Sequence, residues 1–133
     1  MREGRILIID DDPDITEAMS VVLRNKGYDV RVAHDSDQGR ERLKEMKPDL
    51  IILDVMMRTS QEGFEFSREV KQDAQFKDIP ILMLTGVKEK KGIDFKSAAG
   101  DENWLPVQAF LDKPVRPDAL LDKVQDLLAT PKA

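Results

Sequence analysis

The sequence contains no cysteine, which excludes disulfide bonds and any zinc site that depends on cysteine ligands. Its one histidine, His34, is expected to be an ordinary surface residue, because the sequence shows no partners for metal binding or phosphotransfer. Long apolar runs are also missing: those near Ile6 and Leu50 are far shorter than a membrane span, and no signal peptide is recognisable. We therefore expect a cytoplasmic protein without a membrane partner.

Basic residues are outnumbered by acidic ones. Lys and Arg together number 21 against 26 Asp and Glu, which gives a net charge of −5 and a pI near 5.0. This balance argues against general binding to polyanions, so we expect no direct contact with nucleic acid. The length of 133 residues suits one compact domain and is too short for two ordinary ones. We therefore interpret residues 1–133 as a single domain.

Five short segments rich in aliphatic residues predict buried strands. They are residues 5–9, 28–33, 50–54, 79–84 and 109–112. Apolar residues at helical spacing predict helices over residues 13–26, 36–47, 64–74 and 117–128, while 58–62 predict a polar loop and 87–108 show only weak helical periodicity. Strands that alternate with helices predict an α/β fold, with a parallel sheet covered by helices on both faces.

The first predicted helix has a recognisable start. Pro13 suits the first helical position, so Asp12 is expected to cap the helix rather than to bind a ligand. The apolar residues that recur on the expected inward face are Ile15, Ala18, Met19, Val22 and Leu23.

Polar side chains occur where four of the five predicted strands end. Asp10 and Asp11 follow the first strand, Asp54 ends the third, Thr85 follows the fourth and Lys113 follows the fifth. Because the carboxyl ends of parallel strands meet at one edge of a sheet, we expect these groups to share that rim. Three carboxylates within a few Å repel one another unless a cation lies among them. Hard oxygen ligands suit Mg²⁺, with Ca²⁺ or Mn²⁺ as substitutes.

Such a site suits phosphoryl transfer. A carboxylate nucleophile would form an aspartyl-phosphate. The charge of Lys113 and the hydroxyl of Thr85, together with the metal, would hold the three equatorial oxygens of the transferring phosphoryl group.

In this order, the motifs resemble those of the receiver domains of two-component response regulators, including the single-domain chemotaxis regulator. They are the acidic pair after the first strand, the Asp that ends the third, the Thr after the fourth and the Lys-Pro after the fifth. The resemblance covers essentially the whole chain. It implies a flavodoxin-like, doubly wound sheet of five parallel strands in the order 2-1-3-4-5.

The resemblance also implies a metal site and a phosphoacceptor. Asp54 would accept the phosphoryl group and would also contact Mg²⁺. Asp11 would bind the metal directly and Asp10 through water, and the backbone carbonyl of Met56 would be a further ligand.

The family's switch residues have counterparts too. Lys113 would pair with the phosphoryl group, Thr85 would follow it, and Phe110 is either the aromatic that changes rotamer on activation or a core residue. The implied partner is a sensor histidine kinase or a phosphotransfer protein. The implied output surface combines residues 87–108, the strand 109–112 and the last helix, where a downstream protein target would bind and a homodimer would form on phosphorylation.

Two segments depart from the family pattern. Arg58 and Glu62 stand where the family has proline and glycine, the glycine being shifted to Gly63, and the chain is extended around 100–104.

The expected function is a phosphorylation-dependent switch that catalyses only its own phosphorylation and dephosphorylation, without an output domain. One alternative is an aspartyl-phosphate-type phosphatase, which Met56 disfavours because such enzymes carry a second Asp there. The other is an unphosphorylated pseudo-receiver that serves as an interaction module.

Overall fold

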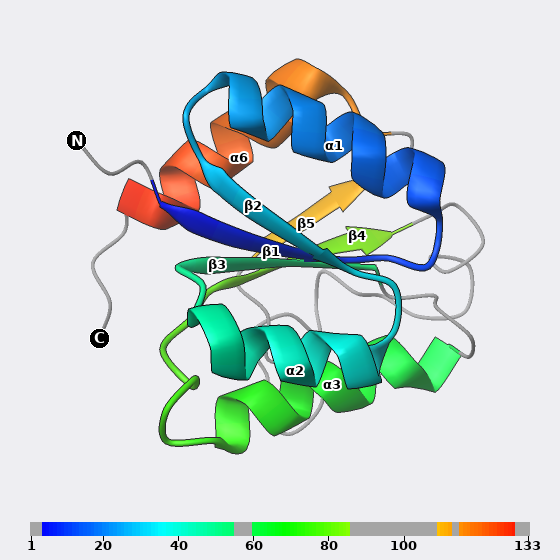
Figure 1. The fold of residues 1–133 in the computed structure, drawn as a ribbon, viewed down its shortest axis with the longest axis vertical. Coiled ribbons are helices and arrows are strands. Elements are labelled where there is room, and N and C mark those ends of the chain that lie inside the picture. The colour runs from blue at the N-terminus through cyan, green and yellow to red at the C-terminus, as the bar shows by residue number, and fades with distance from the viewer. Residues whose placement is uncertain (1–3, 55–59, 86–108, 113–114, 130–133) are drawn as a thin grey trace.

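The computed structural model describes residues 4–54, 60–85, 109–112 and 115–129, apart from the side chains of residues 60–62, 64, 85, 109, 110 and 112. Five parallel strands form one sheet in the order β2-β1-β3-β4-β5 (Figure 1). The strands are β1 (Arg5–Ile9), β2 (Asp29–Ala33), β3 (Leu50–Asp54), β4 (Ile81–Thr85) and β5 (Ala109–Asp112). The predicted parallel sheet of an α/β fold is therefore confirmed.

Helices cover both faces of this sheet. They are α1 (Pro13–Asn25), α2 (Ser36–Met46), α3 (Ser60–Gln72) and α6 (Pro117–Ala129). Figure 1 shows α1 and α6 on one face and α2 and α3 on the other. Successive residues of a strand point to opposite faces. Leu7, Ile9 and Leu53 accordingly join the α2–α3 core layer, whereas Ile8 and Ile52 join the layer under α1 and α6.

The strands end nearly in step, which forms the rim predicted from the sequence. Ile9 at the end of β1 pairs with Ala33 of β2 and Leu53 of β3, and Asp54 pairs with Leu84 of β4. Each residue that follows one of these pairs therefore emerges at the same edge of the sheet.

Hydrogen bonds of Arg5 join three elements at the edge of the sheet where β1 and β3 begin, opposite the rim. The backbone N–H of Arg5 donates to Oδ2 of Asp49 (2.9 Å), and the N–H of Asp49 donates to the carbonyl of Arg5 (2.7 Å). The Arg5 guanidinium donates to the carbonyl of Met46 at the end of α2 (2.9 Å). The starts of β1 and β3 and the end of α2 are thus connected through one arginine.

Three details of the sequence prediction are corrected. The helix α3 begins at Ser60 rather than at residue 64, so residues 60–62 are helical and not loop. A polar first turn shows no apolar periodicity, which is why the pattern placed the start too late. The strand β4 begins at Ile81, because Ile79 instead donates its N–H to the carbonyl of Phe76 in a turn and Pro80 has no N–H.

The third correction concerns α1. Met19 and Leu23 are buried and Ile15 and Val22 pack against the core as expected, but Ala18 is exposed. The polar side chains of Thr16 and Ser20 are buried in addition.

In the described part of the chain, no helix has the length and apolar character needed to cross a membrane.

Candidate functional site

The acidic pair lies in the loop between β1 and α1. The backbone N–H of Asp10 donates to the carbonyl of Ala33 (3.0 Å), which continues the β1–β2 pairing by one residue. This bond holds Asp10 at the rim with its side chain fully buried, whereas Asp11 is exposed. Oδ1 of Asp10 accepts a hydrogen bond from the N–H of Asp12 (3.0 Å). The contact with Ala33 could not be predicted from the residue types, because it depends on backbone atoms.

Asp12 is directed into α1 rather than toward the rim. Its Oδ1 accepts hydrogen bonds from the N–H groups of Asp14 (2.9 Å) and Ile15 (3.4 Å), and Pro13 occupies the first helical position. These are the donors that a helix leaves unsatisfied in its first turn. The predicted capping role of Asp12 is confirmed, and the cap fixes where the acidic loop enters α1.

Asp54 is the last residue of β3 and is buried, with an exposed fraction of 1%. Its backbone lies beside Leu84 of β4, so the carboxylate emerges at the centre of the sheet. Burial of an ionised carboxylate is costly unless the site provides compensating positive charge or hydrogen bonds. A residue of this type at this depth is therefore more consistent with a ligand site than with a solvated strand end.

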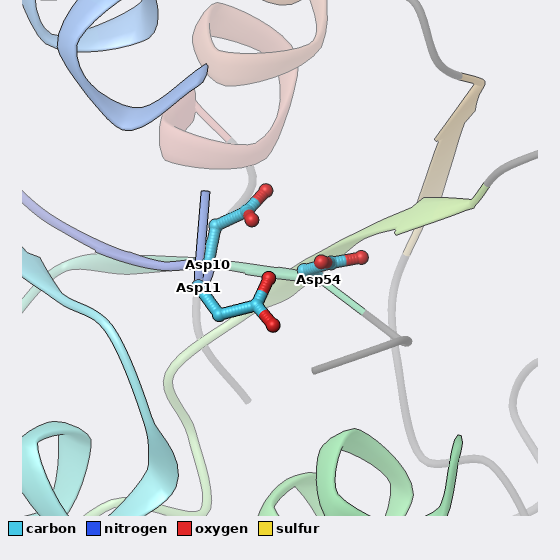
Figure 2. Close-up of side chains that lie close together, drawn as sticks. All are labelled: Asp10, Asp11 and Asp54. Atoms are coloured by element: carbon cyan, nitrogen blue, oxygen red, sulfur yellow. The ribbon is translucent and has the colours of Figure 1, made fainter. Parts of the chain in front are cut away.

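The structure brings the three predicted carboxylates together. One oxygen from each of Asp10, Asp11 and Asp54 can be chosen so that all three lie within 4.8 Å of one another. Figure 2 shows Asp10 and Asp11 coming from the loop after β1 and Asp54 from the end of β3, with the carboxylates gathered beside one another. Residues more than forty positions apart in the sequence thus form one acidic cluster at the rim.

The donor set of this cluster fits a hard divalent cation. Mg²⁺ binds oxygen at about 2.0–2.1 Å in octahedral geometry, so two of its ligands lie at most about 4.2 Å apart, and for Ca²⁺ the limit is about 5 Å. The spacing within 4.8 Å lies inside the limit for Ca²⁺ and a little above that for Mg²⁺, and carboxylate oxygens are the ligands that both ions prefer. Asp11, the exposed member, leaves room for water ligands on the open side.

Two further predicted residues occupy strand positions near the cluster. Thr85 is the last residue of β4 and follows Leu84, the partner of Asp54, so its backbone lies at the same rim. Phe110 lies in β5 beside Met83, two residues before Thr85. The structure describes the backbone but not the side chains of these two residues. Lys113 and Met56 lie outside the described residues.

His34 follows β2 and is exposed, as expected. Its Nε2 lies 3.5 Å from Oγ1 of Thr16 in the first turns of α1. That hydroxyl already donates to the carbonyl of Pro13 (3.0 Å), so it faces His34 as an acceptor. His34 therefore borders the α1 end of the rim but contributes no ligand to the acidic cluster.

Comparison with known proteins identifies the family. The response regulator receiver domain matches the chain over residues 6–125. The chain is 39% identical to the DNA-binding dual master transcriptional regulator RpaA of Synechocystis sp. over 126 residues. This match covers 93% of this chain and 48% of RpaA. It is 34% identical to the phosphate regulon transcriptional regulatory protein PhoB of Pseudomonas aeruginosa, covering 92% of this chain and 51% of PhoB. The chain thus spans about half the length of the curated relatives it matches.

Solved structures of similar length share the fold. A response regulator from Chloroflexus aurantiacus, described as putative, superimposes with a TM-score of 0.81 at 32% identity and covers 96% of this chain and 98% of its own. The chemotaxis protein CheY4 of Vibrio cholerae superimposes with a TM-score of 0.79 at 31% identity, over 93% of this chain and 98% of its own. With the matched residues including all three carboxylates of the cluster, the chain belongs to the response regulator receiver domain family.

Proposed function

We propose that the chain is a phosphorylation-dependent signalling switch in which Asp54 is the phosphoacceptor. The observation that carries the proposal is the position of Asp54, buried at the centre of the rim within 4.8 Å of the carboxylates of Asp10 and Asp11. Membership of the receiver domain family supports the same reading. The phosphoryl donor would be a sensor histidine kinase or a phosphotransfer protein.

The transfer would be a direct displacement at phosphorus. A carboxylate oxygen of Asp54 forms the new O–P bond while the N–P bond of the donor phosphohistidine breaks, and the departing histidine nitrogen keeps the electron pair and takes a proton. Asp11 would hold Mg²⁺ directly, Asp10 would hold it through water, and Asp54 and the carbonyl of Met56 would complete the protein ligands. The bound cation supplies charge neutralisation for the phosphoryl oxygens.

Lys113 and Thr85 would supply the remaining contacts to the phosphoryl group. Their positions after β5 and at the end of β4 support this role, because both strands deliver residues to the same rim. A Lys ammonium and a Thr hydroxyl are suitable donors to oxygens on which negative charge accumulates.

Phosphorylation would act by placing about −1.5 to −2 units of charge at a site that is almost fully buried. Thr85 and Phe110 would respond and change the surface formed by residues 87–108, β5 and α6, where a downstream protein or a second copy of the chain would bind. We propose that this domain itself does not contact nucleic acid, because its net charge is −5. The relatives named as DNA-binding are about twice as long as the part that matches.

The proposed catalysis is limited to the domain's own phosphorylation and dephosphorylation. Incubation with a small acyl phosphate and MgCl₂, followed by intact mass measurement, tests this. The wild type should gain one phosphoryl group, Asp54→Asn should gain none, and the control Asp14→Asn, an exposed carboxylate in the first turn of α1, should behave as wild type.

Two other outcomes would each overturn the proposal. A wild type without a stable mass increase and without release of inorganic phosphate would indicate a pseudo-receiver that acts only as an interaction module. Continuous release of phosphate over many turnovers would indicate a phosphatase of the aspartyl-phosphate type.

A further inference from the structure

Gly39 of helix α2 is buried between Ile9 of β1 and Phe66 of α3. A Cβ atom at this position would lie 2.8 Å from Cδ1 of Ile9 and 3.2 Å from both Cε1 and Cζ of Phe66. Non-bonded carbon atoms prefer about 3.5–4.0 Å, so both contacts would be too short. The fit between α2 and the sheet therefore depends on the missing side chain at residue 39.

Ile9 connects this contact to the acidic cluster. It is fully buried, and its backbone is paired with Ala33 on one side and Leu53 on the other. The next residue along β1 is Asp10, and the residue after Leu53 is Asp54. A force applied to the Ile9 side chain therefore acts on the strand ends that carry two of the three carboxylates. Because Ile9 is fully buried and interiors are close-packed, displacing its terminal methyl also disturbs the side chains packed around it.

A second connection runs through the backbone. Only His34 and Asp35 separate β2 from α2, and both are hydrogen bonded to Gln38. The N–H of His34 donates to Oε1 of Gln38 (3.1 Å), and the N–H of Gln38 donates to Oδ1 of Asp35 (2.8 Å). An outward shift of α2 is thus passed to Ala33, whose carbonyl accepts the hydrogen bond of the Asp10 N–H.

The size of the required shift determines its effect. Moving a contact from 2.8 Å to the lower limit of about 3.5 Å requires a displacement of about 0.7 Å, shared between α2 and β1. Metal–ligand distances in a well-formed site lie within about 0.2 Å of their ideal values, so a third of this displacement, passed along the chain from Ile9 to the direct ligand Asp11, is already of that size.

We propose that Gly39 is a positioning residue for the cation site: its lack of a side chain lets Ile9 hold the acidic pair that follows β1 at the spacing that Asp54 requires. This inference rests on the proposed function, because it assumes that Asp10, Asp11 and Asp54 bind a divalent cation. The groups that it connects are the helix α2, the last residue of β1 and the acidic loop.

The test measures cation binding rather than phosphorylation. Four variants are compared with the wild type by titration calorimetry with Mg²⁺ and Mn²⁺: Gly39→Ala, Ile9→Val, the double variant, and the control Glu41→Ala, an exposed residue on the same helix. Ile9→Val removes Cδ1, the atom that the new Cβ would meet at 2.8 Å. Urea unfolding in the presence of a chelator reports the stability of each variant separately.

We expect Gly39→Ala to weaken cation binding about tenfold, the lower end of the range for residues that orient metal ligands. Binding by the double variant should return to within about twofold of Ile9→Val, and Glu41→Ala should bind as the wild type. The free energy of unfolding without metal should not rank the variants in the same order as cation affinity does. Alanine favours a helix more than glycine does, which offsets part of the steric misfit in Gly39→Ala. If Gly39→Ala does not fold, the double variant carries the test, since removal of Cδ1 should restore folding together with normal binding.

Unchanged cation binding in Gly39→Ala would overturn the inference, as would a loss of binding that the Ile9→Val change does not restore. Either result would leave the proposed function intact, provided that the wild type binds the cation. Absence of saturable binding by the wild type would instead overturn the proposed function itself.

Discussion

The ion pair between Arg40 of α2 and Glu69 of α3 should stabilise the contact between these two helices in a manner that depends on pH. Two hydrogen bonds of 2.8 Å connect the side chains, one from Nε to Oε2 and one from Nη2 to Oε1. The bonds from Arg40 lower the pKa of Glu69 from its ordinary value of 4.5, against a smaller opposing effect of burial. The perturbation is Glu69→Gln, which removes the charge and keeps the size of the side chain.

The magnitude follows from exposure. Two unit charges about 4 Å apart attract by about 1 kcal/mol in water and by about 4 kcal/mol at an effective dielectric of 20. Arg40 and Glu69 are 39% and 50% exposed, so solvent screens most of this attraction. The parallel pair of hydrogen bonds favours the upper part of the range measured for exposed pairs. We therefore expect a coupling energy of about 1 kcal/mol.

The assay is a double-mutant cycle of the wild type, Glu69→Gln, Arg40→Met and both together, measured by urea unfolding. With a denaturant slope of about 2 kcal/mol per M, the coupling corresponds to a midpoint change of about 0.5 M. The control is the Arg42–Glu45 pair, which joins residues three apart within α2 through a 2.9 Å contact and should couple by about 0.3–0.5 kcal/mol.

The sign of the pH dependence is fixed by the lowered pKa of Glu69. The folded-state pKa lies below the unfolded one, so the stabilisation is fully present above the ordinary value of 4.5 and is lost as the pH falls through the lowered value. The coupling should therefore be constant at pH values well above 4.5 and should shrink as the pH falls below 4.5. A coupling at neutral pH no larger than that of Arg42–Glu45, or one that persists in acid, would refute the reasoning.

Three further predictions concern the helix ends and the cation. Asp12→Ala should lower the stability by about 1 kcal/mol through loss of the α1 cap, whereas Asp12→Asn should retain most of it, as thermal unfolding would show. Lys47→Gly should raise the stability by about 1 kcal/mol because residue 47 ends α2 at a φ of 45°, and the matched change Lys44→Gly inside α2 should lower it by a similar amount. Mg²⁺ at ten times its Kd should stabilise the wild type by about 1.4 kcal/mol relative to chelator, and Asp11→Asn should lose this gain; an equal gain in both would contradict the assignment of Asp11.

The features that the sequence predicted well are those that follow from local pattern. Unbroken apolar runs indicate the strands, and the rule that parallel strands end at one edge predicts that Asp10, Asp11 and Asp54 lie together, as the structure shows. The cap at Asp12 followed from its place before Pro13. Each of these inferences needs only the neighbouring residues and the general geometry of an α/β sheet.

The features that the sequence could not predict depend on distances between helices. Asp37, three residues before Arg40, is a partner that the sequence suggests, but nothing near Arg40 indicates that it also pairs with Glu69, 29 residues away on α3. Gly39 could equally be read as a weak point in a helix, since the need for glycine arises from Ile9 and Phe66 on other elements. The start of α3 was placed too late because its first turn is polar and carries no apolar periodicity.

The hydrogen bonds of Arg5 hold together the edge of the sheet that lies opposite the acidic cluster. Arg5 holds the end of α2 at the carbonyl of Met46, while the start of α2 follows Ala33, whose carbonyl accepts the hydrogen bond of the Asp10 N–H. An eleven-residue helix is about 16 Å long, so a tilt of only about 4° about the fastened end moves the other end by about 1 Å. With Arg5 as the fixed point, small changes in the angle of α2 would become displacements of about the length of a metal–ligand mismatch at the edge of the sheet where we propose that Asp54 is phosphorylated.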